Sequence, residues 1–462
     1  MKCRLKYSLK IIFIFTMVSF LFFLKKQMEN FPFQMHNIFN SRHISVDDHS
    51  FLESAFRPSV DDLKLFDRRL TESQLSNILF KRQGNFTLPS LYEIYRETFD
   101  RPSNFSALPI FPHESQSEYD DRIWNQMRYV PEHIHKDGSK FKHILLYYGL
   151  NEVSNESFSQ CPVKKCFVTG DPDLAPNADV ILWMHSLSVP KHRRPFGQIW
   201  ALYLLESPFH TAKFPDFRKL GANYSINWTA TYRHESTLVT PYFKYTPYDF
   251  KNKLSNQKPK KNFSKGKTKL IAWFVSNCGS LNSRLQVVEE LQKYIQVDIY
   301  GLCGPLKCSR DDYKSCFEML SRDYKFYLAF ENSNCRDYIT EKFFLNGLSN
   351  DVLPVVMGAP VEDYQRVAPP HSFIHIDKFE SLKDLAKYLH YLDKEDSAYN
   401  DYFSWKGHGL VDTNSFFWCR LCMLSHESDL VKSDFSNVYD WWFDKTKCTY
   451  SSTWTNVSIK IS

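Results

Sequence analysis

Apolar runs and amphipathic segments alternate between residues 268 and 358, and this alternation limits the fold more than any other feature of the chain. The apolar runs at 268–277, 297–301, 325–332 and 352–358 have the length and composition of buried strands. The segments at 285–295, 311–324 and 340–350 predict helices. Strands that alternate with helices form a parallel, doubly wound sheet, which binds ligands at the carboxyl ends of its strands. We therefore expect an α/β domain at 270–462 with its site in the loops after these strands.

Three further apolar runs, at 143–149, 179–185 and 198–207, predict the buried strands of a first α/β domain at 132–250. Residues 251–269 include eight lysines and predict a solvated linker between the two domains. Residues 25–131 contain scattered prolines without a sustained period and predict a stem. The net charge of +6 is spread along the chain, so nucleic-acid binding has no support. Binding of a dinucleotide cofactor, or of ATP through a P-loop, also has no support, because the sequence lacks G-x-G-x-x-G and Walker motifs.

Residues 11–24 form a run of 14 uncharged, mostly apolar residues with basic residues on both sides. A helix of this length spans about 21 Å, less than the roughly 30 Å of a bilayer core, but flanking lysines can extend its reach. The missing small-residue cleavage pattern favours an uncleaved signal-anchor over the alternatives, a cleaved signal peptide or a core helix. Four positive charges precede the run and two follow it, so residues 1–10 are expected in the cytoplasm and the remainder in the lumen.

A lumenal chain is expected to carry N-linked glycans and disulfides. The acceptor pattern N-x-[ST] occurs at Asn85, Asn104, Asn155, Asn223, Asn227, Asn262 and Asn456. Of the 11 cysteines, Cys3 is expected in the cytoplasm, and the even number that remains is consistent with five bridges. Cys419 and Cys422 form a C-x-x-C motif that we interpret as disulfide-bonded rather than zinc-binding, because a second ligand pair is missing. Asp171 and Asp173 are interpreted as part of a turn rather than a metal motif.

Charged residues follow the strand predicted at 325–332. The sequence FENSNCRDYITEKF at 330–343 ends this strand, turns through a polar loop and begins a helix with Thr340 as its N-cap. The helix start and Lys342 favour a phosphate, and Glu341 is placed to bond ribose hydroxyls. Arg284, in the loop after the strand at 268–277, would reach the same crevice, so two cations indicate a diphosphate ligand. The alternative is an ordinary capped helix with surface charges.

Glu206 stands at the end of the strand predicted at 198–207. Pro208 prevents this strand from continuing, which places the Glu206 carboxylate at the mouth of the crevice. The alternative is a strand-end acid in a salt bridge.

The sequence FENSNCRDYITEKFFLNGLSNDVLPVVMGAP at 330–360 resembles the donor-binding signature of the α1,3-fucosyltransferases, and the similarity runs from about His143 to the C-terminus. AWFVSNCGSLNSRLQVVEELQKYIQVDIYGLCGPLKC at 272–308 is most similar to the branch of plants and invertebrates that modifies the core of N-glycans. The resemblance implies two facing Rossmann-like domains of the GT-B type, GDP-fucose as donor and an N-glycan or glycoprotein as acceptor. It also implies a single-pass type II protein of the Golgi membrane with a lumenal catalytic domain.

By the same resemblance, Glu206 matches the catalytic base. The positions that match donor-binding residues are Arg284, Asn332, Tyr338, Glu341 and Lys342. The resemblance further implies that Cys161 and Cys166 are tied to the pair Cys419 and Cys422. The partners of the remaining cysteines are left open, namely Cys278, Cys303, Cys308, Cys316, Cys335 and Cys448.

The expected function is inverting transfer of fucose from GDP-β-L-fucose to the 3-hydroxyl of GlcNAc in N-glycans, at the Asn-linked core GlcNAc. An inverting displacement needs one base and no protein nucleophile, so no metal is obligatory, and stimulation by Mn²⁺ or Mg²⁺ is left open. One alternative is a Lewis-type α1,3-fucosyltransferase that acts on terminal N-acetyllactosamine. The other is a catalytically inactive lumenal glycan-binding protein.

Overall fold

The computed structural model describes residues 110, 122–135, 138–147, 155–159, 161–184, 188, 190–211, 225–247, 261–308, 312–412, 415–428 and 437–450. The cytoplasmic tail predicted at 1–10, the membrane helix predicted at 11–24 and most of the stem predicted at 25–131 lie outside these residues. Within the described ranges, no helix is both long and apolar enough to cross a membrane.

The first sheet has six parallel strands in the order β2-β1-β3-β4-β5-β6. In chain order they are β1 (Lys142–Leu146), β2 (Cys166–Thr169), β3 (Val180–Met184), β4 (Ile199–Leu204), β5 (Trp228–Thr231) and β6 (Leu238–Val239). The predicted strands correspond to β1, β3 and β4, which lie side by side at the centre. Their continuous apolar sequences fit this position, because both faces of a central parallel strand are buried.

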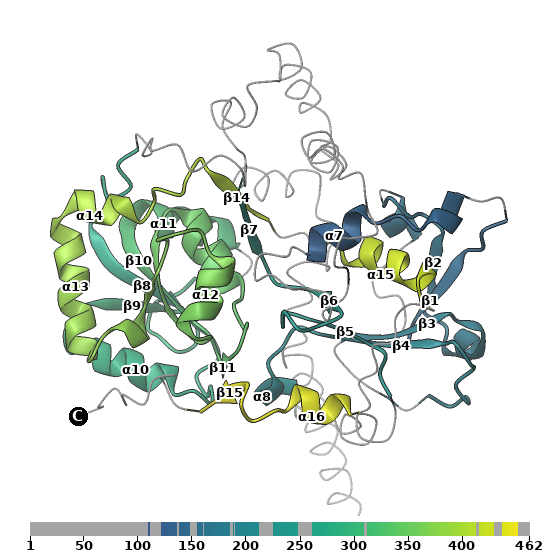
Figure 1. Ribbon diagram of the computed structural model, residues 1–462. Coiled ribbons are helices and arrows are strands. Elements are labelled where there is room, and N and C mark those ends of the chain that lie inside the picture. Colours follow the sequence, from purple (N-terminus) through teal and green to yellow (C-terminus); the bar gives the residue numbers. More distant parts are fainter. Residues whose placement is uncertain are drawn as a thin grey trace, which may run out of the picture. The chain divides into compact units, whose positions relative to one another are not determined.

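The second sheet has five parallel strands in the order β13-β12-β10-β8-β9. They are β8 (Lys269–Phe274), β9 (Val297–Tyr300), β10 (Tyr324–Phe330), β12 (Leu353–Met357) and β13 (Ile374–His375). Helices α10 (Arg284–Leu291), α13 (Leu382–Lys394) and α14 (Asp396–Asp401) share one apolar cluster with this sheet, and α11 (Tyr313–Asp323) and α12 (Val361–Val367) share another. Trp273 and Ala272, neighbours on β8, belong to different clusters. The predicted doubly wound arrangement is confirmed (Figure 1).

The helix predicted at 340–350 is present, but most of it is not an α-helix. A π-helix occupies Lys342–Gly347, and a 3-10 turn follows at Leu348–Asn350. Phe343, Phe344 and Leu345 are all buried, whereas Lys342 and Asn346 are half-buried. Glu341 directly precedes the π-helix, and the Thr340 hydroxyl bonds the Glu331 carboxylate and also accepts from the Lys342 backbone N–H at 3.5 Å.

The packed region begins earlier than the predicted boundary at residue 132. Helix α7 (Arg122–Arg128) falls within the predicted stem, yet its Gln126 amide donates to the Thr237 carbonyl of the first sheet at 2.9 Å. Arg122 donates to the neighbouring Ser236 carbonyl at 3.0 Å. At the other end of the predicted first domain, β7 (Lys244–Pro247) pairs with β14 (Gly409–Asp412), and Phe243 packs in a core cluster of the second sheet.

The end of the predicted linker is also packed rather than solvated, because Phe263 is buried against the second sheet. Two of the predicted glycosylation sites have described side chains. The side-chain carbonyl oxygen of Asn227 accepts from the Trp200 backbone N–H at 2.8 Å, and the side-chain amide of Asn262 donates to Asp396 at 3.1 Å. Glycosylation at all seven positions stays a prediction.

The chain returns to the first sheet after completing the second. Helix α15 (Phe417–His426) packs its buried Leu421 and Leu424 into the core of the first sheet (Figure 1). Two disulfides fasten it there, and three more join the other six cysteines of the described residues. The bridges are Cys161–Cys419, Cys166–Cys422, Cys278–Cys303, Cys308–Cys316 and Cys335–Cys448.

The C-x-x-C motif is therefore disulfide-bonded, as expected. His426 lies beside Cys166 and Cys422 at a distance that a metal site would need, but both sulfurs are bonded and His426 Nε2 bonds the Lys165 carbonyl at 2.9 Å. The Asp171 carboxylate accepts from the Asp173 backbone N–H and caps the 3-10 helix at Pro172–Asn177, which confirms the predicted turn.

The bridges Cys161–Cys419 and Cys166–Cys422 span nearly the same loop, with sequence separations of 258 and 256. Chain-entropy estimates give about 5 kcal/mol for the first closure of such a loop and roughly half of that for the second, which closes only a small ring. We expect Cys161→Ala/Cys419→Ala to lower the unfolding temperature modestly, and loss of all four cysteines to lower it much more. Calorimetry checks this order. Non-reducing peptide maps that show free thiols at Cys419 and Cys422 would contradict the pairing.

Candidate active site

Glu206 and Tyr338 meet where a strand of the first sheet ends. Strand β4 ends at Leu204, and α8 (Pro208–Thr211) begins with a proline that cannot extend the ladder. The half-buried Glu206 carboxylate lies between them and accepts a hydrogen bond from the Tyr338 hydroxyl through Oε2 at 3.2 Å. Its other oxygen, Oε1, has no hydrogen-bond partner in the described part of the chain. The sequence-predicted base therefore adjoins a sequence-predicted donor residue.

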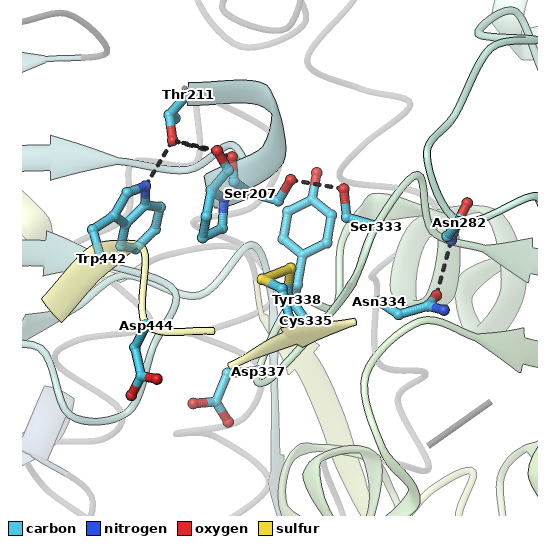
Figure 2. The surroundings of a disulfide bond; sticks show 12 residues. Ser207, Thr211, Asn282, Ser333, Asn334, Cys335, Asp337, Tyr338, Trp442 and Asp444 are labelled. Atoms are coloured by element: carbon cyan, nitrogen blue, oxygen red, sulfur yellow. Dashed lines mark hydrogen bonds between the residues drawn. A yellow bond between two sulfur atoms is a disulfide. The ribbon is translucent and has the colours of Figure 1, made fainter. Parts of the chain in front are cut away.

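Further contacts join the loop after β10 to the segment after β4. The hydroxyls of Ser207 and Ser333 are 2.7 Å apart, and Figure 2 draws this bond as a dashed line. Burial, followed by the negative charge of Glu206, raises the pKa of Tyr338 well above its usual value. Tyr338 therefore stays protonated and can donate to Glu206.

Lys342 is surrounded by acceptors rather than open to solvent. Its Nζ lies 3.1 Å from Glu331 Oε2, 3.0 Å from Glu341 Oε1 and 2.8 Å from the Thr340 hydroxyl. Burial acts to lower the pKa of Lys342, but the two carboxylates outweigh it and hold the pKa above its ordinary value. Burial raises the pKa of Glu331, and the charge of Lys342 opposes that shift.

Glu331 is the residue that sequence reasoning left out of the site. It directly follows β10, whose seven residues are all buried, and it is itself fully buried. A charged residue immediately after such a strand is costly unless it is paired, which is the signal that the sequence carries at this position.

Arg284 is the first residue of α10 rather than part of the preceding loop, and it is buried. Its guanidinium donates to the Phe330 carbonyl at 2.7 Å and to the Asn277 carbonyl at 3.1 Å. It thus stands at the carboxyl ends of β8 and β10, as expected. Burial lowers the pKa of Arg284, and the charge of Glu331 opposes the shift.

Four buried polar atoms at these strand ends have no hydrogen-bond partner in the described part of the chain. They are Asn282 Oδ1, Arg284 Nε, Asn332 Oδ1 and Glu341 Oε2. Each such atom costs about 1–3 kcal/mol, so native proteins keep few of them. These four atoms all lie within the segments that follow β8 and β10. They indicate a place where a polar ligand supplies the missing hydrogen-bond partners.

Asp337 holds the loop that carries Tyr338. It has a left-handed backbone with φ of 60° and accepts from Arg366 at 2.7 Å and from the ring of His234 at 2.6 Å. Burial acts to raise the pKa of Asp337, but His234 and Arg366 outweigh it, so the pKa lies below its usual range. Because His234 follows β5 of the first sheet, this ion pair also connects the two halves of the site.

The comparisons with known proteins agree with this geometry. Residues 139–243 match the model "Fucosyltransferase, N-terminal", and residues 264–441 match "Glycosyltransferase family 10 (fucosyltransferase) C-term". The chain is therefore a glycosyltransferase. The chain belongs to glycosyltransferase family 10, the fucosyltransferases.

Three relatives show the extent of the similarity. Glycoprotein 3-alpha-L-fucosyltransferase A of Drosophila melanogaster is 48% identical over 85% of this chain and 77% of its own length. Alpha-(1,3)-fucosyltransferase fut-1 of Caenorhabditis elegans is 35% identical over 59% of this chain and 63% of its own length. The human 4-galactosyl-N-acetylglucosaminide 3-alpha-L-fucosyltransferase FUT6 is 39% identical over 56% of this chain and 70% of its own length.

Replacement of Asp337 by Asn keeps a residue that tolerates the left-handed backbone and removes the charge. A carboxylate with a lowered folded-state pKa contributes stability above its ordinary pKa of about 4 and loses it as the pH falls through the folded value. We expect Asp337→Asn to lower the unfolding temperature by about 5 °C at neutral pH, and the difference to shrink in acid. Glu289→Gln, which removes an exposed carboxylate of α10, is the control and should change little. An equal drop in unfolding temperature at neutral and at acidic pH would contradict the lowered pKa of Asp337.

Proposed function

We propose that this chain transfers fucose from GDP-β-L-fucose to the 3-hydroxyl of the Asn-linked core GlcNAc of N-glycans, with inversion at the anomeric carbon. The observation that carries the proposal is the hydrogen bond between Tyr338 and Glu206. It brings a carboxylate of the first sheet against the loop whose sequence resembles the donor-binding signature, so a base and a donor site share one crevice.

The donor would lie at the ends of β8 and β10. Its diphosphate would take Lys342 and Arg284 as cationic partners, and Asn332 and Glu341 each keep a buried oxygen available for donor hydroxyl or amino groups. In the structure Lys342 and Arg284 are balanced by Glu331 and Glu341, so these four side chains are neutral as a set when all are ionised. The diphosphate would therefore replace part of the carboxylate coordination of Lys342.

The reaction follows from the stereochemistry of the donor. The acceptor 3-hydroxyl oxygen attacks the anomeric carbon as the bond from that carbon to GDP breaks, and Glu206 accepts the hydroxyl proton. Lys342 and Arg284 stabilise the charge that develops on the departing GDP. The scheme needs no protein nucleophile and gives a metal ion no obligatory role, and it leaves room for stimulation by Mn²⁺ or Mg²⁺.

Two observations support a lumenal, Golgi location for the catalytic part. All ten cysteines between residues 161 and 448 are paired, which fits an oxidising compartment. The relatives carry names of enzymes that modify glycoproteins or oligosaccharides. Anchoring through residues 11–24 stays a prediction, because these residues lie outside the described ranges.

The acceptor is tested by a panel of glycans with the full-length chain and GDP-fucose. The Drosophila relative, which is similar over most of both chains, is named for glycoprotein 3-fucosylation, and this favours the core acceptor. Transfer to glycopeptides with an intact chitobiose core is expected. Transfer only to terminal N-acetyllactosamine would instead establish the Lewis-type alternative. Glycan binding without transfer to either acceptor would indicate the inactive binding protein.

Glu206→Gln should leave GDP-fucose binding near wild type, because glutamine can still accept from Tyr338. Loss of the base should lower kcat by about 10² or more. Steady-state kinetics and calorimetry measure the two effects separately. Asp171→Asn is the matched control, because that exposed carboxylate only caps a 3-10 helix. Retained turnover in Glu206→Gln would contradict the assignment of Glu206 as the base.

Lys342→Ala should weaken GDP and GDP-fucose binding together, because both ligands carry the diphosphate. The expected loss is roughly 1.5–3 kcal/mol, the scale of a charge-assisted hydrogen bond. The substitution also leaves Glu331 without its counter-ion, so Lys342→Ala/Glu331→Gln is measured beside it. If the double variant binds GDP like wild type, the single variant acted through the unpaired carboxylate, and Lys342 is no phosphate ligand. Lys387→Ala, on the surface of α13, is the control for charge alone.

A further inference from the structure

Phe209 and Tyr450 form an aromatic pair that the proposed mechanism does not use. Their rings are stacked, with centroids 4.3 Å apart and planes inclined by 17°. Tyr450 is 64% exposed, and Phe209 is half-buried. Stacked aromatic rings at the surface of a soluble domain offer a flat apolar face to a ligand.

The pair is close to the proposed base. Phe209 lies in α8 and follows Glu206 by three residues, which limits the separation of their Cα atoms to about 10 Å. Pro208 and Thr211 of the same helix are buried, so α8 places its apolar contacts on the protein side and leaves Phe209 to pack with Tyr450. A ligand on this pair is thus within one or two sugar rings of the carboxylate.

Tyr450 is held in place by unusually many anchors. Residues 437–450, which we name the C-terminal brace, comprise α16 (Val438–Trp442) and β15 (Cys448–Thr449). On the first sheet's side, Trp442 Nε1 donates to the Thr211 hydroxyl at 2.7 Å, and Figure 2 shows this bond beside α8. Arg233 donates to the carbonyls of Trp441 and Trp442, both at 2.8 Å.

On the second sheet's side, β15 pairs with β11 (Asn334–Cys335), and the disulfide Cys335–Cys448 crosses this two-strand ladder. The bridge lies two residues before Tyr450 and three residues before Tyr338 in their respective segments. The brace therefore fixes an exposed aromatic side chain beside the loop that contacts Glu206. Packing of the protein core alone does not require Tyr450 to be held in this position, because its side chain remains largely exposed.

We infer that Phe209 and Tyr450 form an acceptor subsite that binds a pyranose ring of the glycan, next to the sugar that is fucosylated. A pyranose presents a patch of C–H groups on its face and hydroxyls around its rim, so it can lie on an aromatic ring while its polar groups remain in water. This inference rests on the proposed function, since it places the subsite beside the proposed base. It adds a specificity element contributed by two segments that are far apart in the sequence.

The test uses the full-length chain with GDP-fucose and an N-glycopeptide that has an intact core. Tyr450→Ala and Phe209→Ala should each raise KM for the glycopeptide by about tenfold, the scale of an aromatic contact. KM for GDP-fucose should be unchanged. Tyr450→Phe keeps the ring and should retain the wild-type KM. The matched control is Tyr391→Ala, which removes another exposed tyrosine, 51% exposed and stacked on Tyr388 in α13.

Unchanged glycopeptide KM in both alanine variants would overturn the inference. A parallel rise in KM for the donor would also overturn it, because that result means a general disturbance of the crevice. If wild type transfers no fucose to the glycopeptide, the proposed acceptor is wrong, and this outcome is seen before any variant is compared. Calorimetric binding of the glycopeptide in the presence of GDP then decides the inference by itself, since weaker binding to Tyr450→Ala than to wild type supports it and equal binding refutes it.

Discussion

The buried carboxylate of Glu331 is the group on which the conformation of the loop after β10 depends. It is fully buried at the end of β10 and accepts from the Thr340 backbone N–H, the Thr340 hydroxyl and Lys342. These contacts close the loop after β10 back onto its own strand, which fixes the span that carries Tyr338. An isolated charge at this depth would cost several kcal/mol, so the loop conformation and the ion pair require each other. Gly358 on the neighbouring segment is part of the same arrangement, because a Cβ there would come within 2.8 Å of the Glu331 side chain.

This arrangement means that the crevice is charged and balanced before any ligand arrives. Two cations and two carboxylates lie close together with little access to water, and several polar atoms around them have no partner in the described part of the chain. The low polarity of the surroundings strengthens each contact between these charged groups. A dianionic ligand can make use of the electrostatic energy that such a site stores.

The central strands could be predicted from the sequence because each is a continuous apolar run, as in β3, β10 and β12. Strands β5 and β6 were not predicted. The sequence of β5, WTAT, is too polar, and that of β6, LV, is too short to be recognised as a buried strand. Glu206 and Lys342 were found through their place after strands and through family resemblance. Glu331 was missed because the importance of a buried charge depends on a partner nine residues or more along the chain. The pairing of Cys335 with Cys448 could not be derived, since spacing does not determine connectivity.

The return of α15 to the first sheet has a consequence for the order in which the chain folds. The core of the first sheet includes Leu421, Cys422 and Leu424, which are synthesised after the whole second sheet. The strands of the second sheet, by contrast, are contiguous from Lys269 to His375. During synthesis the later domain can therefore complete its core first, while the earlier one exposes apolar surface until α15 arrives and its disulfides form. Domains usually mature in the order of their synthesis, and here the topology reverses it.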